Sequence, residues 1–194
     1  MNTGYSKKDI RKFGKIASSN GAKLVLINSA KGLTNYLNSK DASSSKLSEN
    51  RENDKVESLT IFGHGFINSA EFGYHQTPSE QEKFSWDRDD ATKLDDDAFE
   101  NANICFYTCN AATLKAEGDK SLIQVVAEAT KSTVSGYEGR SDYAPINRGE
   151  GWGAKINRNI NGFNTNGSFG PPVGGTNDAT GGQRSRRIVV NGRQ

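Results

Sequence analysis

Short runs of almost entirely apolar residues are the feature that most limits how this chain can fold. They occupy residues 23–28, 58–63 and 103–109. Runs of this length and composition are typical of strands that are covered on both faces, as in a parallel sheet. Segments with helix-like spacing of apolar residues lie between them, at 6–19, 33–37, 94–99 and 119–130.

The order of these segments predicts one α/β domain with a mainly parallel sheet, because crossovers between parallel strands are right-handed. We expect Asp119 to cap the helix that follows it, and residues 132–136 to form a further strand. Residues 40–56 are polar and predict an exposed, mobile loop, while Glu71–His75 is a candidate short strand. The terminal segment RSRRIVVNG is a candidate basic edge strand.

Apolar residues are concentrated in the first two thirds of the chain. Hydrophobic residues make up 33% of the 194 residues, and 13 of the 21 glycines lie from Gly136 onward. A glycine-rich segment with few large side chains favours irregular structure. We therefore expect a core at residues 1–140 and an irregular, Gly/Asn-rich extension at 141–194 that packs on the same domain.

The charge balance excludes strongly electrostatic functions. The formal net charge is only +2, whereas nucleic acids and anionic membranes usually recruit a clear excess of Lys and Arg. The sequence shows neither an apolar run long enough to span a bilayer nor a signal-peptide h-region near its start. We expect a cytoplasmic protein, or one delivered into a target cell as part of a secreted polypeptide.

Two cysteines, Cys105 and Cys109, lie in one predicted strand. Four residues along a strand span about 13 Å, whereas a disulfide needs Cα atoms within about 7 Å, so the two cannot bond to each other there. The spacing of His64 and His75 does not suit paired metal ligands either. We predict neither a disulfide between them nor a metal site.

His64 and Cys109 are the candidate catalytic pair. Each follows an apolar strand, and the carboxyl ends of neighbouring parallel strands meet at one edge of a sheet, where reacting groups collect. The two residues are 45 positions apart, and His64 lies between two glycines that permit a sharp turn. A thiol beside an imidazole suits a nucleophile and its acid–base partner. Cys105 and His75 are interpreted as structural residues.

The segments LTIFGHG and ICFYTCNA, in this order and spacing, resemble the caspase-like (clan CD) superfamily of cysteine peptidases, over roughly residues 20–140. The superfamily includes caspases, gingipains, clostripain, CHAT-type proteases and toxin autoprocessing domains. The resemblance implies a three-layer sandwich with helices flanking a mainly parallel sheet. It also implies that Cys109 attacks a peptide carbonyl and His64 protonates the leaving amine. The backbone amides of Gly65 and Cys109 would form the oxyanion hole, and no acidic third member is required.

Two narrower resemblances bear on cofactor and partners. SGYEGR followed by Gly151-Trp152 is similar to toxin autoprocessing domains that are activated by inositol hexakisphosphate, but Phe66 stands where those domains commonly have Lys, so we expect no cofactor. TCNAA with GYEGRSDYA looks like caspase-like modules of bacterial polymorphic toxins. That context implies a toxin effector or self-processing endopeptidase whose partners are a protein substrate, its own carrier chain or an immunity protein.

Alternatives remain open at the level of sequence. The chain could be a catalytically silent caspase-like binding module of a polymorphic toxin system. Anion or nucleic-acid binding through Arg184, Arg186, Arg187 and Arg193 is a weaker hypothesis, because such arginines can also protect a terminal strand from edge pairing. Substrate-binding residues are not marked. An acidic segment could favour a basic substrate or simply form a solvated helix face: Asp87, Asp89, Asp90, Asp95, Asp96, Asp97 and Glu100.

Overall fold

A computed structural model describes residues 7–19, 21–44, 46–73, 77–142, 173–177 and 183–193. Over these residues the chain is mixed α/β, with a mostly parallel central sheet flanked by helices, which confirms the coarse fold predicted above. The helical elements are α1 (Lys7–Ser19), α2 (Ala30–Ser39), α3 (Glu49–Glu52), α4 (Pro78–Phe84), α5 (Arg88–Ala91), the 3₁₀ turn η1 (Asp96–Ala98) and α6 (Leu122–Thr130).

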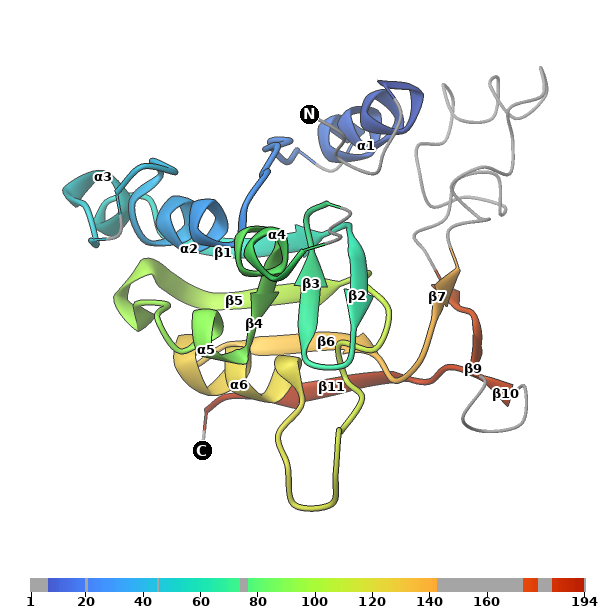
Figure 1. Cartoon of the computed structure of the whole chain (residues 1–194). Coiled ribbons are helices and arrows are strands. Elements are labelled where there is room, and N and C mark those ends of the chain that lie inside the picture. Colours follow the sequence, from blue (N-terminus) through green and yellow to red (C-terminus); the bar gives the residue numbers. More distant parts are fainter. Residues whose placement is uncertain are drawn as a thin grey trace.

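The central sheet has the strand order β1-β5-β6-β11, formed by β1 (Val56–Ile61), β5 (Phe99–Phe106), β6 (Thr133–Tyr137) and β11 (Arg187–Asn191). Figure 1 shows these strands one below another. β1, β5 and β6 are mutually parallel, whereas β11 pairs antiparallel with β6, from Arg187 opposite Tyr137 to Asn191 opposite Thr133. The edge strand predicted near the end of the chain is therefore confirmed, and the sheet draws its last strand from beyond residue 140.

Three smaller sheets accompany the central one. A three-stranded antiparallel sheet contains β2 (His64–Phe66), β3 (Ser69–Glu71) and β4 (Ser85–Asp87), and it crosses in front of the central strands in Figure 1. The other two pair β7 (Ser141–Asp142) with β8 (Val173–Gly174), and β9 (Thr176–Asn177) with β10 (Gln183–Arg184). The short β3 ends at Glu71, so the strand predicted over Glu71–His75 is misplaced, and His75 lies outside the described residues.

The core lies between the central sheet and the elements that cover one of its faces. Ile104 and Phe106 of β5 are buried there, as are Leu122 and Val126 of α6. Trp86 of β4 is fully buried and stacks on Phe106, with ring centroids 6.1 Å apart. This packing fixes the β2–β3–β4 sheet against the central sheet and thereby positions the turn that begins at His64.

The opposite face of the sheet carries a different set of side chains. Ser58, Thr60, Asn103 and Val189 are exposed on it. Near the carboxyl ends of the strands, Phe13 of α1 stacks on Phe62 with ring centroids 4.8 Å apart. Because successive side chains of a strand alternate between faces, the residues that continue this polar face past the strand ends include those of the candidate site.

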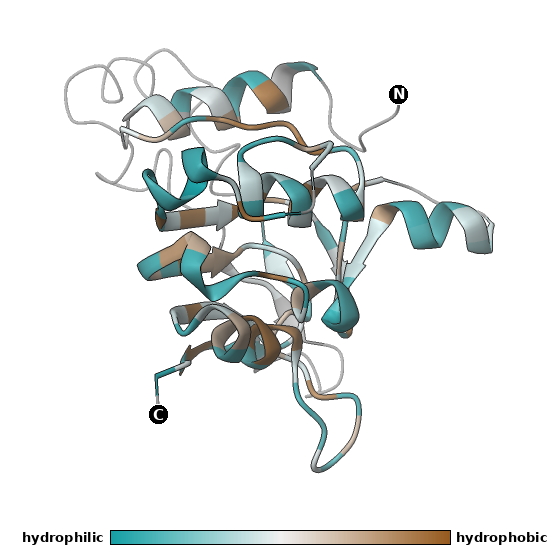
Figure 2. Cartoon of the chain, turned by 90° about the vertical axis from the view of Figure 1, so that its left-hand side faces the viewer, coloured by the Kyte–Doolittle hydropathy of each residue, from teal (hydrophilic) through white to brown (hydrophobic). Residues whose placement is uncertain are grey.

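The apolar run at residues 23–28 is not a strand, contrary to the prediction. It is an extended segment in which Leu24 and Leu26 are exposed and Val25 and Ile27 are half-buried. Figure 2 shows it as a hydrophobic stretch of coil that returns beside α1. The side chains alternate as in a strand, but a strand also needs a backbone partner, and the ladder pairings do not include these residues.

Two helix predictions also fail through local capping. η1 replaces the helix predicted over 94–99: Asp95 caps this single turn by accepting the Asp97 N–H, and Phe99 already begins β5. Ser121, not Asp119, caps α6, through a capping box in which Gln124 accepts the Ser121 N–H at 2.8 Å. The Asp119 carboxylate is instead paired with Arg88, whose hydrogen bond lowers the pKa of Asp119.

Residues 40–56 are more structured than the predicted mobile loop, over the part that is described. Ser48 caps α3, and Arg51 is buried with its guanidinium donating to the carbonyls of Tyr36 and Asp54, both at 3.0 Å. A buried guanidinium that bonds two carbonyls ties this segment to α2. The polar composition of residues 40–56 did not reveal this anchoring, because the residue that provides it, Arg51, is itself charged.

Thr34→Val is expected to lower the free energy of unfolding by about 1–3 kcal/mol, the usual effect of leaving a buried donor without its acceptor. The Thr34 hydroxyl accepts the indole N–H of Trp86 at 2.9 Å inside the core, and Val keeps the side-chain volume. Urea denaturation measures the loss. Thr60→Val, at an exposed position of β1, should stay within about 0.5 kcal/mol of the parent. Equal losses would contradict the role given to this hydrogen bond.

Candidate active site

The register of two parallel strands brings the ends of β1 and β5 together. Thr60 lies opposite Cys105 and Ile61 opposite Phe106, an offset of 45 residues. The alignment continues past the strand ends, since the Tyr107 N–H donates to the Ile61 carbonyl at 2.9 Å and the rings of Phe62 and Tyr107 stack at 5.3 Å. His64 and Cys109 follow Ile61 and Phe106 by three residues each, so both lie just beyond the carboxyl edge of the sheet.

Gly65 provides a second indication that the segments following β1 and β5 approach each other closely. A Cβ atom on Gly65 would lie 2.3 Å from the carbonyl oxygen of Cys109, 2.9 Å from Cβ of Thr108 and 3.1 Å from the Cys109 nitrogen. Contacts this short are possible only for glycine. The turn after β1 therefore packs directly on the turn after β5, and the backbone at Gly65, the predicted oxyanion position, adjoins the Cys109 amide.

The Cys109 thiol is half-buried and bonded to a segment that follows β6. Its Sγ accepts the Ser141 N–H at 3.3 Å and lies 3.5 Å from the Ser141 Oγ, which in turn donates to the Tyr107 carbonyl at 2.9 Å. This N–H and the contact with the Ser141 hydroxyl orient the thiol at the sheet edge. Ser141 was not identified from the sequence, since no motif marks a residue that acts through its backbone.

The turn that carries Cys109 is also fixed on its far side. Asn110 has a left-handed backbone with φ 59°, a conformation that Asn tolerates better than most residues. Its N–H donates to the Gly139 carbonyl at 2.6 Å, and the Ala112 N–H donates to the Tyr137 carbonyl at 3.0 Å. The turn that carries Cys109 is thus held by backbone contacts with three parts of the chain: the end of β5, the backbone at Gly65 and the segment that follows β6.

His64 is exposed and begins β2. It pairs across the β2–β3 ladder with Glu71, so its side chain emerges on the same face of the hairpin as that of Glu71. The arrangement can supply an accessible acid–base group beside a thiol. Glu71 was not considered from the sequence as a site residue, because cross-strand pairing in such short strands leaves no periodic pattern.

Cys105 occupies a different place. It lies within β5, half-buried, with Nη2 of Arg187 at 3.6 Å from its sulfur; the same nitrogen donates to the Ser135 hydroxyl at 2.8 Å. Burial raises the pKa of the neighbouring Tyr107, and the Cys105 sulfur contributes in the same direction, so this phenol stays neutral. Cys105 lies one residue before the end of β5 and four residues before Cys109, and its sulfur contacts Arg187 of β11.

The acidic residues Asp95–Asp97 lie at the opposite end of β5 from Cys109. The eight residues of β5 separate the two ends, which is about 25 Å along a strand. Asp96 is paired with Lys131, whose hydrogen bond lowers the pKa of Asp96. Side-chain oxygens of the three aspartates lie within 4.8 Å of one another, but exposed acidic clusters of this kind are common without an ion. These aspartates are therefore too distant to line a substrate pocket beside His64 and Cys109.

Arginines near the end of the chain make contacts within it. Arg186 bonds Glu138 through Nε at 2.6 Å and Nη2 at 3.1 Å, and Arg193 Nε donates to the Lys131 carbonyl at 3.3 Å. With the Arg187 contacts, they tie β11 to β6 and to the turn after α6. These contacts give Arg186, Arg187 and Arg193 roles within the described part of the fold.

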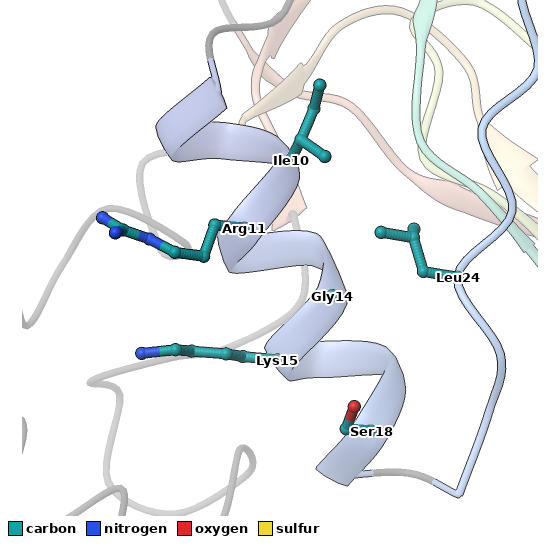
Figure 3. Close-up of a pocket in the computed structure, with 6 residues that line it drawn as sticks. All are labelled: Ile10, Arg11, Gly14, Lys15, Ser18 and Leu24. Carbon is teal, nitrogen blue, oxygen red and sulfur yellow. The ribbon is translucent and has the colours of Figure 1, made fainter.

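A separate groove lies between α1 and the extended segment that follows it (Figure 3). Ile10 and Leu24 face each other across it, while Arg11 and Lys15 point away from Leu24. Gly14 and Ser18 complete its lining, which includes neither His64 nor Cys109.

Comparisons with known proteins add no assignment. The chain matches no protein-family model, and searches of curated proteins and of solved structures return no significant match. Across the described residues, no helix combines the length and apolar character needed to cross a bilayer.

Proposed function

We propose that this protein is a cysteine endopeptidase of the caspase-like type that uses Cys109 as nucleophile and His64 as acid–base partner. The observation that carries the proposal is the register of β1 and β5, an offset of 45 residues that continues through Tyr107. His64 and Cys109 have this same offset and follow the two paired strand ends. The close packing of Gly65 on the Cys109 backbone supports the same juxtaposition.

The proposed chemistry follows from these two groups. His64 takes the thiol proton, and the Cys109 sulfur attacks the peptide carbonyl carbon to form a C–S bond. Backbone amides at Gly65 and Cys109 stabilise the oxyanion, and the C–N bond breaks as His64 returns its proton to the leaving amine. Water, deprotonated by His64, then cleaves the thioester and regenerates the thiol.

The proposal extends to biological context only through the sequence resemblance. A toxin effector or a self-processing domain would act on a protein substrate or its own carrier chain, with an immunity protein as a further partner. In the proposed caspase-like architecture the second helical layer would cover the polar face of the sheet, on which α1 lies in the described residues. No cofactor enters the proposed chemistry.

Iodoacetamide labelling of the native chain tests whether Cys109 is a catalytic thiol. We expect Cys109 to react at least about tenfold faster than Cys105 at neutral pH, because a thiolate beside an imidazole and an N–H donor reacts faster than a structural thiol. Peptide mapping by mass spectrometry measures both rates in one sample. Equal rates at the two cysteines would instead support a catalytically silent binding module.

Mass spectrometry of the purified chain beside Cys109→Ala tests turnover directly. We expect clipping within residues 40–56 or 141–194 that disappears in the variant. Clipping that persists in Cys109→Ala would arise from a contaminating protease and would count against self-processing.

A further inference from the structure

The β2–β3 hairpin places an acidic side chain beside His64. His64 and Glu71 are directly opposite each other in the antiparallel ladder, so their side chains emerge on the same face. Opposite residues of such a pair have Cβ atoms about 4.5–5.5 Å apart, a separation that a carboxylate and an imidazole can bridge. Cys109 follows β5 just as His64 follows β1, and the backbone of Gly65 packs against that of Cys109.

Glu71 is held rigidly in place. The residue is only 3% exposed, and its Oε1 accepts the hydroxyl of Ser69 at 2.6 Å and the hydroxyl of Ser85. Ser69 precedes it by two residues and Ser85 lies opposite it on β4, so all three side chains share one face of the sheet. The other face carries Ala70 and Trp86, both fully buried in the core. A carboxylate anchored in this way has little freedom to turn away from the hairpin.

We infer that Glu71 is a positioning residue for His64, which makes the site a Cys109–His64–Glu71 array rather than an isolated dyad. Its carboxylate accepts the N–H of the imidazole nitrogen that does not face Cys109. This contact fixes the ring orientation and favours the imidazolium that forms when His64 takes the thiol proton. In the proposed step Glu71 acts only as a hydrogen-bond acceptor, and no proton moves to it.

Other titratable groups near His64 act in different ways. Asp87 of β4 shares the face of Glu71 but is exposed, so solvent screens its charge. Tyr107 and Cys109 approach from the end of β5, and burial raises the pKa of Tyr107, which leaves it uncharged. Of these acidic groups Glu71 alone combines burial with a position directly opposite His64.

Glu71→Gln tests the inference because it keeps the size of the side chain and removes its charge. The catalytic consequence rests on the proposed peptidase function. With fluorescein-labelled casein as substrate, we expect kcat to fall about tenfold to a hundredfold while KM stays within about twofold, the usual consequence of losing a group that orients a reacting one. Glu71→Asp should restore part of kcat. Glu57→Gln, at an exposed position of β1, is the matched control and should leave kcat unchanged.

A spectroscopic measurement separates this inference from the proposed function. In the inactive Cys109→Ala chain, the ¹⁵N shifts of the His64 ring report which nitrogen carries the proton, and His75→Gln assigns the signals. We expect one fixed tautomer that is lost or weakened in Glu71→Gln and retained in Glu57→Gln. Unchanged His64 shifts in folded Glu71→Gln would overturn the positioning role even if the protein is a peptidase. If the His64 shifts change in this way but the chain that retains Cys109 has no peptidase activity, the positioning role stands and the proposed function is overturned.

Discussion

Cys109→Ala and His64→Ala are each expected to lower casein hydrolysis by at least about a thousandfold, whereas Cys105→Ala should leave it within about twofold. Removing either member of a nucleophile–base pair abolishes the covalent route, because the two groups act as a unit. The double variant should therefore lose no more activity than either single one. Initial rates at saturating and limiting casein measure these effects.

The comparison with Cys105 makes this prediction specific. Both thiols are half-buried and come from one continuous stretch of chain, but Cys105 lies within β5, whereas Cys109 follows it at the sheet edge. Only Cys109 accepts the Ser141 N–H. Thermal unfolding of the variants confirms that each is folded. Equal loss of activity in folded Cys105→Ala would mean that the wrong thiol has been assigned.

Gly65→Ala is expected to separate the two halves of the site. Its Cβ would lie 2.3 Å from the Cys109 carbonyl oxygen, so either the His-Gly turn or the Cys109 turn must move. Overpacking of this kind costs about 3 kcal/mol. A displacement near 1 Å between reacting groups lowers catalysis by about a hundredfold, because their alignment is lost. We therefore expect lower stability together with slower casein hydrolysis and slower labelling of Cys109.

Gly14→Ala is the matched control for this substitution. A Cβ on Gly14 would meet only Cδ2 of Leu24 at 3.5 Å, an ordinary contact, and the residue lies within α1. Alanine in a helix interior is neutral or stabilising relative to glycine. Normal Cys109 labelling in Gly65→Ala, at a stability equal to that of Gly14→Ala, would show that the two turns do not pack as described.

The central strands could be predicted from sequence because their signal is local. The strands β1, β5, β6 and β11 each consist of residues that favour a pleated, buried surface, and each was expected near its observed place. Residues 23–28 carry the same local signal but do not form a strand. A strand must pair with a neighbouring strand, and the composition of residues 23–28 does not determine whether such a neighbour is present. The helix predicted over 94–99 is only a single 3₁₀ turn because β5 begins at Phe99, and Asp119 does not cap α6 because its carboxylate pairs with Arg88.

The candidate site divides in the same way. The two residues proposed to react were identified as candidates from the sequence because both follow apolar strands, and parallel topology gathers strand ends at one edge. Ser141 and Glu71 were not, because one acts through its backbone and the other through pairing in a three-residue strand. Neither property alters the composition or periodicity of the surrounding sequence.

By itself, the sequence determined the α/β class, the strands of the central sheet and the choice of His64 and Cys109 as candidate residues. These depend on residue type and spacing along the chain. Only the tertiary structure decided the 45-residue register between β1 and β5, the Ser141 amide on the Cys109 sulfur and the place of Glu71 across from His64. The first two join segments distant in sequence, and the third joins the two strands of a hairpin. All three are set by how sheets, turns and core side chains pack together.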